Sequence, residues 1–150
     1  MANNLLLSSE TDLIVIELHY QVKQNKHGQR QFRVLTEKEA AEFPEPAEGE
    51  DRPYETLVTK WRPQTWQTNN SLLKNSMTYN NVSGNSELDW SSYQQNVFKY
   101  CLAEWDVTDD QGNPVPPSIE NVGLLPSVVA RALIQNYDAA LMIDDEEKKE

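Results

Sequence analysis

The sequence has only one cysteine, five glycines and no long hydrophobic run. A single cysteine, Cys101, cannot form an intramolecular disulfide, so a secreted scaffold held together by disulfides is excluded. Cys101 lies in an apolar helical pattern, where we expect its thiol to fill the core. No apolar stretch approaches the ~18 residues that a membrane helix needs. No basic region precedes Leu5, Leu6 and Leu7, which are therefore not a secretory signal. We expect an intracellular, soluble chain without membrane contact.

Phosphate loops and common catalytic patterns are missing as well. There is no GxGxxG or Walker A pattern, and the two histidines, His19 and His27, occur without an HExxH or CxxC pattern. The aspartates before Gly112 are similar to a calcium loop. Aligning this glycine with the invariant sixth position puts Val107 first and Ser118 twelfth, so the first ligand and the bidentate glutamate are absent. An aspartate-rich turn is the favoured interpretation, and we expect no enzyme activity, no cofactor and no metal site.

Positive charge is scarce and unevenly placed. The 24 acidic residues against 13 basic ones give a net charge of −11, which argues against a general phosphate-binding surface. Residues 37–55 hold eight of the acids, whereas residues 12–36 carry four bases against two acids. The 4 Trp, 6 Tyr and 3 Phe distinguish the chain from the charged, aromatic-poor disordered class. We therefore expect a folded domain with acidic, solvated segments.

A β-hairpin is predicted for residues 12–36. The apolar residues from Ile14 to Val22 alternate with mostly polar ones, as in a half-buried strand. Gly28 supplies a position that tolerates positive φ at the turn, and Phe32 and Val34 resume the alternation. Because an isolated two-stranded hairpin is only marginally stable in water, its apolar face must cover the helices or pair with another chain.

Residues 37–55 are predicted to be an acidic connector. Thr36 is a candidate N-cap for a short helical turn over residues 37–43, with Glu39 reaching back to it. Pro44, Pro46 and Pro53, together with repulsion among the acids, oppose regular structure beyond that turn. The segment is either a solvated linker or an acidic peptide that binds a partner.

The remainder, residues 56–143, is predicted to be helical with loops. Pro63 marks the first turn of a helix that carries Trp66 and is broken at residues 79–85. A second helix starts at Ser86 or Asp89 and has an apolar stripe, consisting of Trp90, Tyr93, Val97, Cys101 and Trp105 with Phe98 and Leu102 beside it. Ser118 caps a short turn. Pro126 opens a last helix with Val129, Leu133, Ile134, Tyr137 and Leu141 on one face.

Two sets of residues are candidates for partner binding. The first is the basic, aromatic part of the hairpin, consisting of Tyr20, Lys23, Lys26, Arg30, Phe32 and Arg33. These bases could protect an exposed strand edge, dock on an acidic surface of a copy or partner, or follow a phosphate backbone. The second set is Trp61 and Trp66, which lie beside Pro63 in a polar setting and are expected at the surface, whereas Trp90 and Trp105 are expected in the core.

One stretch, residues 90–137, carries a family resemblance. An aromatic-ended helix runs into Trp105-Asp106; the Asp109-Asp110-Gln111-Gly112-Asn113-Pro114-Val115-Pro116 segment follows; and Leu125-Pro126 opens the last helix. This order resembles the tail-assembly chaperone-like and minor tail proteins of tailed bacteriophages. The resemblance implies a non-catalytic role in virion assembly, in which the chain binds the tape measure, the tail tube or neighbouring virion subunits, in the host cytoplasm or in the virion. The hairpin and its long acidic connector are additions to a minimal helical chaperone.

The sequence thus predicts an α+β fold, an N-terminal β-hairpin followed by a mainly α-helical domain. Its segments are the hairpin arm (1–36), the acidic connector (37–55), the helical domain (56–143) and a frayed acidic tail (144–150). The predicted function is that of a phage tail assembly chaperone or adaptor. The alternatives are a permanent minor protein of the virion, in the tail or the head–tail region, and a nucleic-acid binder that uses the basic hairpin. A homo-oligomer is compatible with each.

Overall fold

The computed structural model describes residues 4–142. A four-stranded antiparallel sheet has the strand order β2-β1-β3-β6 and is formed by β1 (Ile14–Gln24), β2 (Arg30–Leu35), β3 (Glu55–Trp61) and β6 (Leu102–Trp105). A second sheet has two strands, β4 (Met77–Asn80) and β5 (Asn85–Leu88). The helices are α1 (Glu37–Ala41), α2 (Trp66–Asn75), α3 (Trp90–Cys101), α4 (Ile119–Val122) and α5 (Ser127–Ala140).

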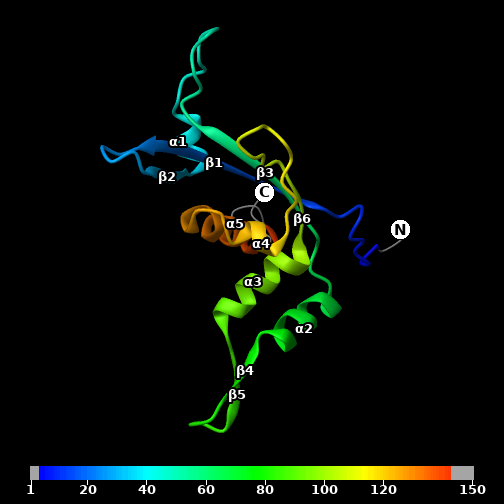
Figure 1. Cartoon of the computed structure of the whole chain (residues 1–150). Helices are drawn as coiled ribbons and strands as arrows, with labels where there is room; N and C mark the ends of the chain where they lie inside the picture. The colour runs from blue at the N-terminus through cyan, green and yellow to red at the C-terminus, as the bar shows by residue number, and fades with distance from the viewer. Residues whose placement is uncertain (1–3, 143–150) are drawn as a thin grey trace.

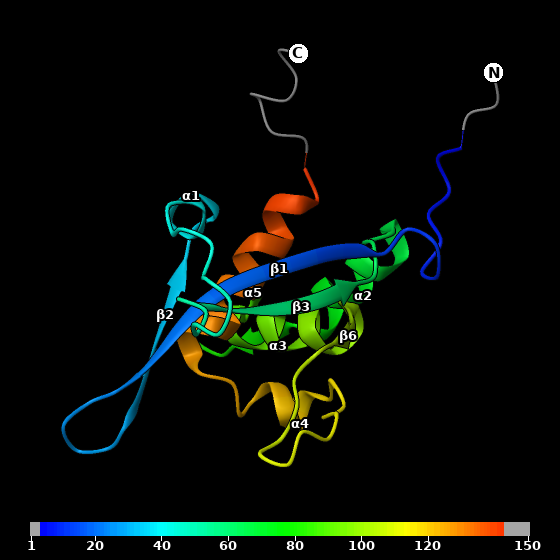
Figure 2. The same cartoon turned by 90° about the horizontal axis from the view of Figure 1, so that it is seen from above.

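The larger sheet is covered on one face by α3 and α5 (Figures 1 and 2). Ile16 and Leu18 of β1 point into this layer and are 7% and 2% exposed. α5 packs against them with the apolar face predicted for the last helix. Four residues of that face are buried, namely Val129, Leu133, Ile134 and Tyr137. The α2 helix packs beside α3, further from the sheet (Figure 1). The core is therefore formed between the sheet and the helices.

The prediction of an N-terminal hairpin followed by a mainly helical domain is wrong. The fold is mixed, and the hairpin is extended into a sheet by two strands from the region expected to be helical. β3 pairs with β1 from Trp61 opposite Ile14 to Glu55 opposite Tyr20. β6 in turn pairs with β3. The hairpin thus gains a third strand beside β1, and helices cover its apolar face. These contacts provide the stability that an isolated two-stranded hairpin lacks in water.

β3 has the residue pattern of a strand, although the sequence was interpreted as part of a helical region. Leu57, Thr59 and Trp61 are buried at every second position, and the residues between them are more exposed. The Thr59 hydroxyl donates to the Ile16 carbonyl at 2.9 Å and accepts from the Trp61 indole N–H at 2.7 Å. A buried threonine thereby satisfies both its own polar group and that of its neighbour.

α3 ends where the chain begins to form hydrogen bonds with the end of β3. The helix was expected to continue to Trp105, but it stops at Cys101, and Leu102 already has an extended backbone. The backbone N–H of Arg62 donates to the Cys101 carbonyl at 2.7 Å, and the Arg62 guanidinium donates to the Leu102 carbonyl at 3.2 Å. Arg62 thus satisfies the carbonyls of the last residue of α3 and of the residue after it. The four residues from Leu102 to Trp105 then pair with β3 as β6. Trp105 consequently lies on a strand.

Several local predictions are confirmed. The hairpin forms β1 and β2, and its Gly28 has a φ of +78°. Thr36 caps α1 in a complete capping box with Glu39. Ser118 caps α4, and α5 follows directly after Pro126. Asp109 closes its turn by accepting from the backbone N–H groups of residues 111 and 113. Each of these features depends on neighbours in the sequence.

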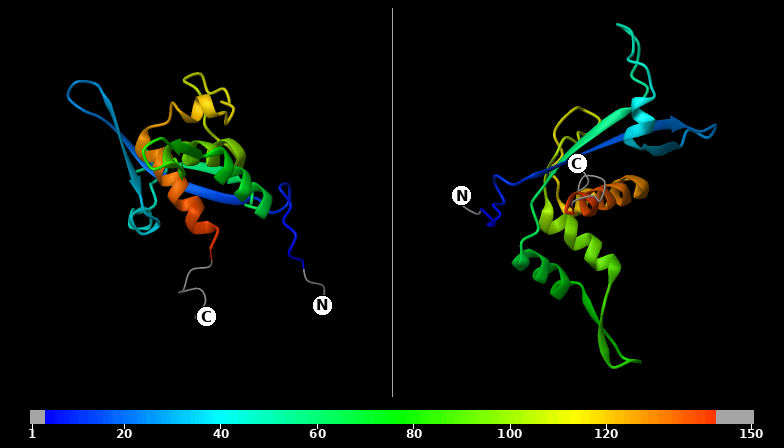
Figure 3. Two further views of the ribbon diagram at one scale, coloured as in Figure 1. Left: turned by 90° about the horizontal axis from the view of Figure 1, so that it is seen from below. Right: turned by 180° about the vertical axis from the view of Figure 1, so that it is seen from behind.

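The break predicted at residues 79–85 is instead part of the β4–β5 hairpin. This hairpin projects from the end of α2 and returns to the start of α3, away from the larger sheet (Figures 1 and 3). Its register places Met77 opposite Leu88 and Tyr79 opposite Ser86. Buried Ser76 anchors its base, since the Ser76 carbonyl accepts from the Asp89 N–H at 2.8 Å.

The division into arm, connector, helical domain and tail stays a prediction. Within the described residues, the main core cluster joins Ile16 and Leu18 of the predicted arm with Trp61, Leu133 and Tyr137 of the predicted helical domain. The predicted frayed tail, residues 144–150, lies outside the described residues.

Candidate interaction surfaces

Chemistry-bearing side chains do not gather into a catalytic or metal centre in the part of the chain that the structure describes. Residues 4–142 contain no group of three or more His, Cys, Asp or Glu that could hold a metal ion. Cys101 is fully buried, as expected, and burial raises the pKa of its thiol. His19 is held by the Thr56 hydroxyl at 2.9 Å and by the edge of the Tyr54 ring. The described helices include none long and apolar enough to cross a bilayer.

The basic hairpin has two different faces. Pairing of Gln21 with Arg33 and of Lys23 with Gln31 places Lys23 and Arg33 on the outer face of the sheet. A shallow hollow of about 530 Å³ lies along this stretch, lined by Gln21, Lys23, Gln31, Phe32 and Arg33. Lys26 lies in the turn at the tip. The predicted basic site is therefore divided between the outer face, the turn and the inner face.

The inner face of the same hairpin carries its aromatic side chains. Tyr20, Phe32 and Arg30 share the side that faces the helices, and the Arg30 guanidinium lies 5.6 Å from the centre of the Phe32 ring. Burial, together with a hydrogen bond to Glu55, raises the pKa of Tyr20 to about 12. Arg33, on the other side, is bound to Glu39 at 2.6 Å. Of the four bases, Arg33 is thus already neutralised by a partner within the chain.

The four tryptophans occupy very different environments, and two expectations are wrong. Trp61, expected at the surface, is 0% exposed and stacks on Tyr137 with ring centroids 4.6 Å apart. Trp90, expected in the core, is 68% exposed. It lies on the same helical face as Val97 and Cys101, but it is the first residue of α3, beyond the part of that face that the core covers. A partner could therefore contact Trp90, whereas Trp61 is inaccessible in the folded protein.

The other two tryptophans agree with their predicted environments. Trp66 is 83% exposed as the first residue of α2. Trp105 packs against the core and donates its indole N–H to the Val115 carbonyl at 2.5 Å. That bond fastens the loop after β6 to the edge of the sheet. Trp66 and Trp90 are thus the two tryptophans that a partner can reach.

The β4–β5 hairpin adds further exposed apolar side chains to this region. Tyr79 is 65% and Val82 is 97% exposed, and Met77 at the base is also exposed. The ring of Trp90 packs edge-on against Tyr93 on the first turns of α3, with centroids 5.7 Å apart. We call the surface formed by α2, the β4–β5 hairpin and the start of α3 the arm surface; its exposed apolar members are Trp66, Leu73, Met77, Tyr79, Val82 and Trp90.

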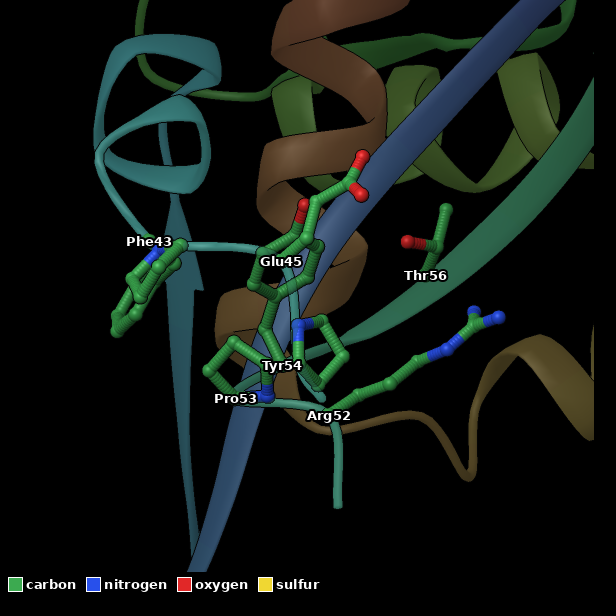
Figure 4. Close-up of a pocket in the computed structure, with 8 residues that line it drawn as sticks. Phe43, Glu45, Arg52, Pro53, Tyr54 and Thr56 are labelled. Atoms are coloured by element: carbon green, nitrogen blue, oxygen red, sulfur yellow. The ribbon is translucent and has the colours of Figure 1, made fainter. Parts of the chain in front are cut away.

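Further hollows lie elsewhere on the described part of the molecule, and two of them concern the helices and the acidic connector. One, of about 370 Å³, lies between α3, α4 and α5 over Phe98, Val122 and Ala130. The other, of about 410 Å³, lies under the proline-rich loop between α1 and β3 (Figure 4). Tyr54 stands in the middle of this second hollow, between Phe43 on one side and Arg52 and Thr56 on the other. Its lining combines proline rings with single charges of each sign and contains no paired acid and base.

Apart from Trp66, which was predicted to be a surface residue, the arm surface was missed from the sequence for a physical reason. Trp90 fits the apolar stripe of α3 by spacing, but it belongs to the first turn, where no neighbouring helix reaches it. Tyr79 and Val82 stand among asparagine, serine and glycine, a composition that predicts a loop. Alternation over Met77 and Tyr79 was the one available signal of a strand, and it spans only four residues.

Comparisons with known proteins add no relative to this description. No protein-family model, no curated protein and no solved structure matches the chain.

Proposed function

We propose that this chain is a non-catalytic assembly protein of a tailed bacteriophage, acting by protein–protein contact as a tail assembly chaperone or adaptor. The resemblance over residues 90–137 suggests this class. The observation that carries the contact role is the arm surface, where Trp66 is 83%, Trp90 68% and Val82 97% exposed. Large aromatic side chains left in water at the starts of two helices, beside a projecting hairpin with exposed apolar residues of its own, are typical of a binding surface.

The physical properties of the arm surface suit a protein partner. Tryptophan and tyrosine provide large contact areas at low entropic cost and dominate the binding energy of many interfaces. The net charge of −11 would keep a protein with such a surface dispersed before its partner binds. A tape-measure or tail-tube subunit, which must remain unassembled until it is needed, is the kind of partner we propose.

Co-expression with a tape-measure or tail-tube protein of the same phage tests the chaperone role. We expect the chain to raise the soluble fraction of that protein several-fold, and Trp66→Ser with Trp90→Ser to abolish the gain. Leu124→Ser is a matched control, because Leu124 is 82% exposed but lies outside the arm surface. An unchanged soluble fraction with wild-type chain, or equal effects of the two sets of variants, contradicts the proposal.

Mass spectrometry of purified particles separates a transient chaperone from a permanent minor virion protein. A chaperone leaves before the particle is complete, so we expect the chain in lysates but not at stoichiometric level in virions. Stoichiometric recovery from virions would favour the permanent structural role and contradict the transient one.

Nucleic-acid binding by the hairpin remains the alternative, and one observation favours it. Lys23, Lys26 and Arg30 form no ion pair with any residue of the described chain. Measurement of DNA affinity against salt tests the idea, since each phosphate contact adds about 0.9 to the slope of log K against log salt. A slope that falls when all three bases are changed to serine supports the alternative, and absence of binding at low salt removes it.

A further inference from the structure

The two edges of β1 are occupied to different lengths. β3 pairs with β1 from Ile14 to Tyr20, whereas β2 pairs only with the stretch from His19 to Gln24. On the β2 side, the first five residues of β1 therefore have no strand beside them. This notch continues the line of β2 and forms an open edge within the sheet.

β2 stops early because the sequence after it starts a helix. Thr36 accepts from the Glu39 N–H at 3.1 Å, and the Glu39 carboxylate accepts from the Thr36 N–H at 3.1 Å. This capping box turns the chain into α1 directly after Leu35. The strand that would have covered the rest of β1 is thus diverted by a signal in its own sequence.

The alternation of hydrogen bonds along β1 and β2 identifies the backbone groups of β1 that face the notch. The Asn25 N–H donates to the Gln29 carbonyl at 2.9 Å across the turn. In an antiparallel pair such bonds recur at every second residue, so the odd-numbered residues of β1 direct their N–H and carbonyl groups toward β2. For Val15 and Glu17 these groups point into the notch, where no described strand receives them.

The notch has the room and the lining for one more strand. It encloses about 450 Å³ between β1, the end of β2 and α5. Ile16 and Leu18 line it from the sheet, Val34 and Leu35 from the end of β2, and Ala132 from α5. Val15 itself is 54% exposed at its rim. A strand placed here would gain backbone hydrogen bonds and an apolar floor together.

The chain also exposes a segment suited to that place. Leu5 is 80%, Leu6 88% and Leu7 49% exposed. A turn holds Ser8 against Asp12, with the Ser8 N–H donating to the Asp12 carboxylate at 2.7 Å. Beyond that turn the segment leads away from the sheet (Figures 1 and 2). Residues 4–9 carry no charge, so they bring no repulsion to Glu17 and Glu37 at the notch.

We propose that residues 4–8 of a second copy of this chain add as a strand to the open edge of β1, beside Val15 and Glu17. Alternate leucines face the two sides of a strand. Leu5 and Leu7 then cover the floor near Ala132, and Leu6 lies beside Val15 on the outer face. This strand addition buries Leu5 and Leu7 against the apolar floor, brings Leu6 into contact with Val15 and pairs the two open backbone positions.

The symmetry of the exchange sets the size of the assembly. If two copies exchange segments reciprocally, a closed dimer forms, and if each copy donates to the next, a ring or an open filament results. This self-association is independent of the proposed phage function, because it depends only on the notch and the leucines of the chain itself.

Sedimentation of the full chain over a range of concentrations tests the proposal. We expect masses at multiples of the 17.2 kDa protomer. Replacing Leu5, Leu6 and Leu7 together by serine should return the protein to the protomer mass. Leu124→Ser is the matched control, because Leu124 is 82% exposed outside both the notch and the arm surface and should leave the mass unchanged.

Val15→Pro tests the notch rather than the segment. The Val15 N–H points out of the ladder with β3, so proline there removes the open donor without removing a bond of the sheet. We expect a protomer of unchanged core. If the proline variant does not fold, an excess of the peptide Asn-Leu-Leu-Leu-Ser-Ser added to wild-type chain provides the same information, since it should occupy the notch and dissociate the oligomer.

Mixing the two variants distinguishes exchange between copies from folding back within one copy. The Val15→Pro chain retains the segment and the serine chain retains the notch, so together they should form a heterodimer although each alone is a protomer. A wild-type chain that stays at 17.2 kDa up to about 1 mM overturns the proposal. So does an oligomer that persists in the serine variant.

Discussion

At the scale of single residues, the core is organised around a buried polar and aromatic junction. Trp61 stacks on Tyr137, and the Tyr137 hydroxyl donates to the Arg62 carbonyl at 2.6 Å. The same arginine binds the end of α3 through its backbone and side chain. β3, α3 and α5 thus meet at three residues, and changes there should affect the stability of the whole protein.

Tyr137 should make the protein sensitive to alkali. Burial raises its pKa above the ordinary value of 10.0, so the unfolded chain releases this proton while the folded chain still holds it. The free energy of unfolding is therefore unaffected below about pH 10 and falls above it, by up to ~1.4 kcal/mol per pH unit from this group. In urea denaturation between pH 10 and 12, Tyr137→Phe should lose stability less steeply than wild type.

The same substitution has a cost at neutral pH. Loss of the bond to the Arg62 carbonyl should lower the free energy of unfolding by about 1 kcal/mol. Tyr79→Phe is the control, because Tyr79 is 65% exposed and should alter neither the neutral stability nor the alkaline slope. Equal slopes for Tyr137→Phe and wild type would contradict the assignment of Tyr137 as an alkali-sensitive group.

Cys101 should be inert in the folded protein. It is 0% exposed, and burial raises the pKa of its thiol, so the reactive thiolate is both scarce and inaccessible. We expect a thiol reagent at pH 8 to label the native chain only as fast as it opens, and to label the chain in denaturant at once. Rapid native labelling would show that α3 moves away from β3.

At the scale of elements, those with their own boundary signals were predictable. The β1–β2 hairpin has alternation and a glycine turn, α1 has both halves of its capping box, and α5 has an apolar face after a proline. β3 and β6 were not predictable in the same way. β6 follows a helical stripe without a break, and only pairing with β3 ends that helix.

The β4–β5 hairpin should be dispensable for folding. Replacing residues 79–86 by Asn-Gly keeps Thr78 opposite Glu87 and joins them by a two-residue turn. Since the side chains removed are mostly exposed, we expect the free energy of unfolding in urea to change by less than ~1 kcal/mol. A larger loss would show that the β4–β5 hairpin supports the core, and this hairpin would then be unsuited to serve as part of a free binding surface.

At the scale of the whole molecule, the core predicts one cooperative unit. Leu18 of β1 is 2% exposed and Leu133 of α5 is 0% exposed in the same cluster. Leu18→Ala should cost about 2–5 kcal/mol and lower the unfolding midpoint equally by tryptophan fluorescence and by far-ultraviolet circular dichroism. Leu73→Ala, at a residue that is 40% exposed, should cost much less. Separate midpoints for the two signals would instead favour independent unfolding of the predicted hairpin arm (1–36) and the predicted helical domain (56–143).

Local signals in the sequence by themselves determined the N-terminal hairpin, the capped ends of the helices and the uneven charge, because each depends on residues close together in the chain. Tertiary structure alone decided that β3 and β6 extend the hairpin, since a strand is specified by a partner that lies far away in sequence. It also decided which tryptophans are accessible. Trp61 is buried by α5 and Trp90 is left in water, because burial depends on what packs against a residue and not on its hydrophobicity.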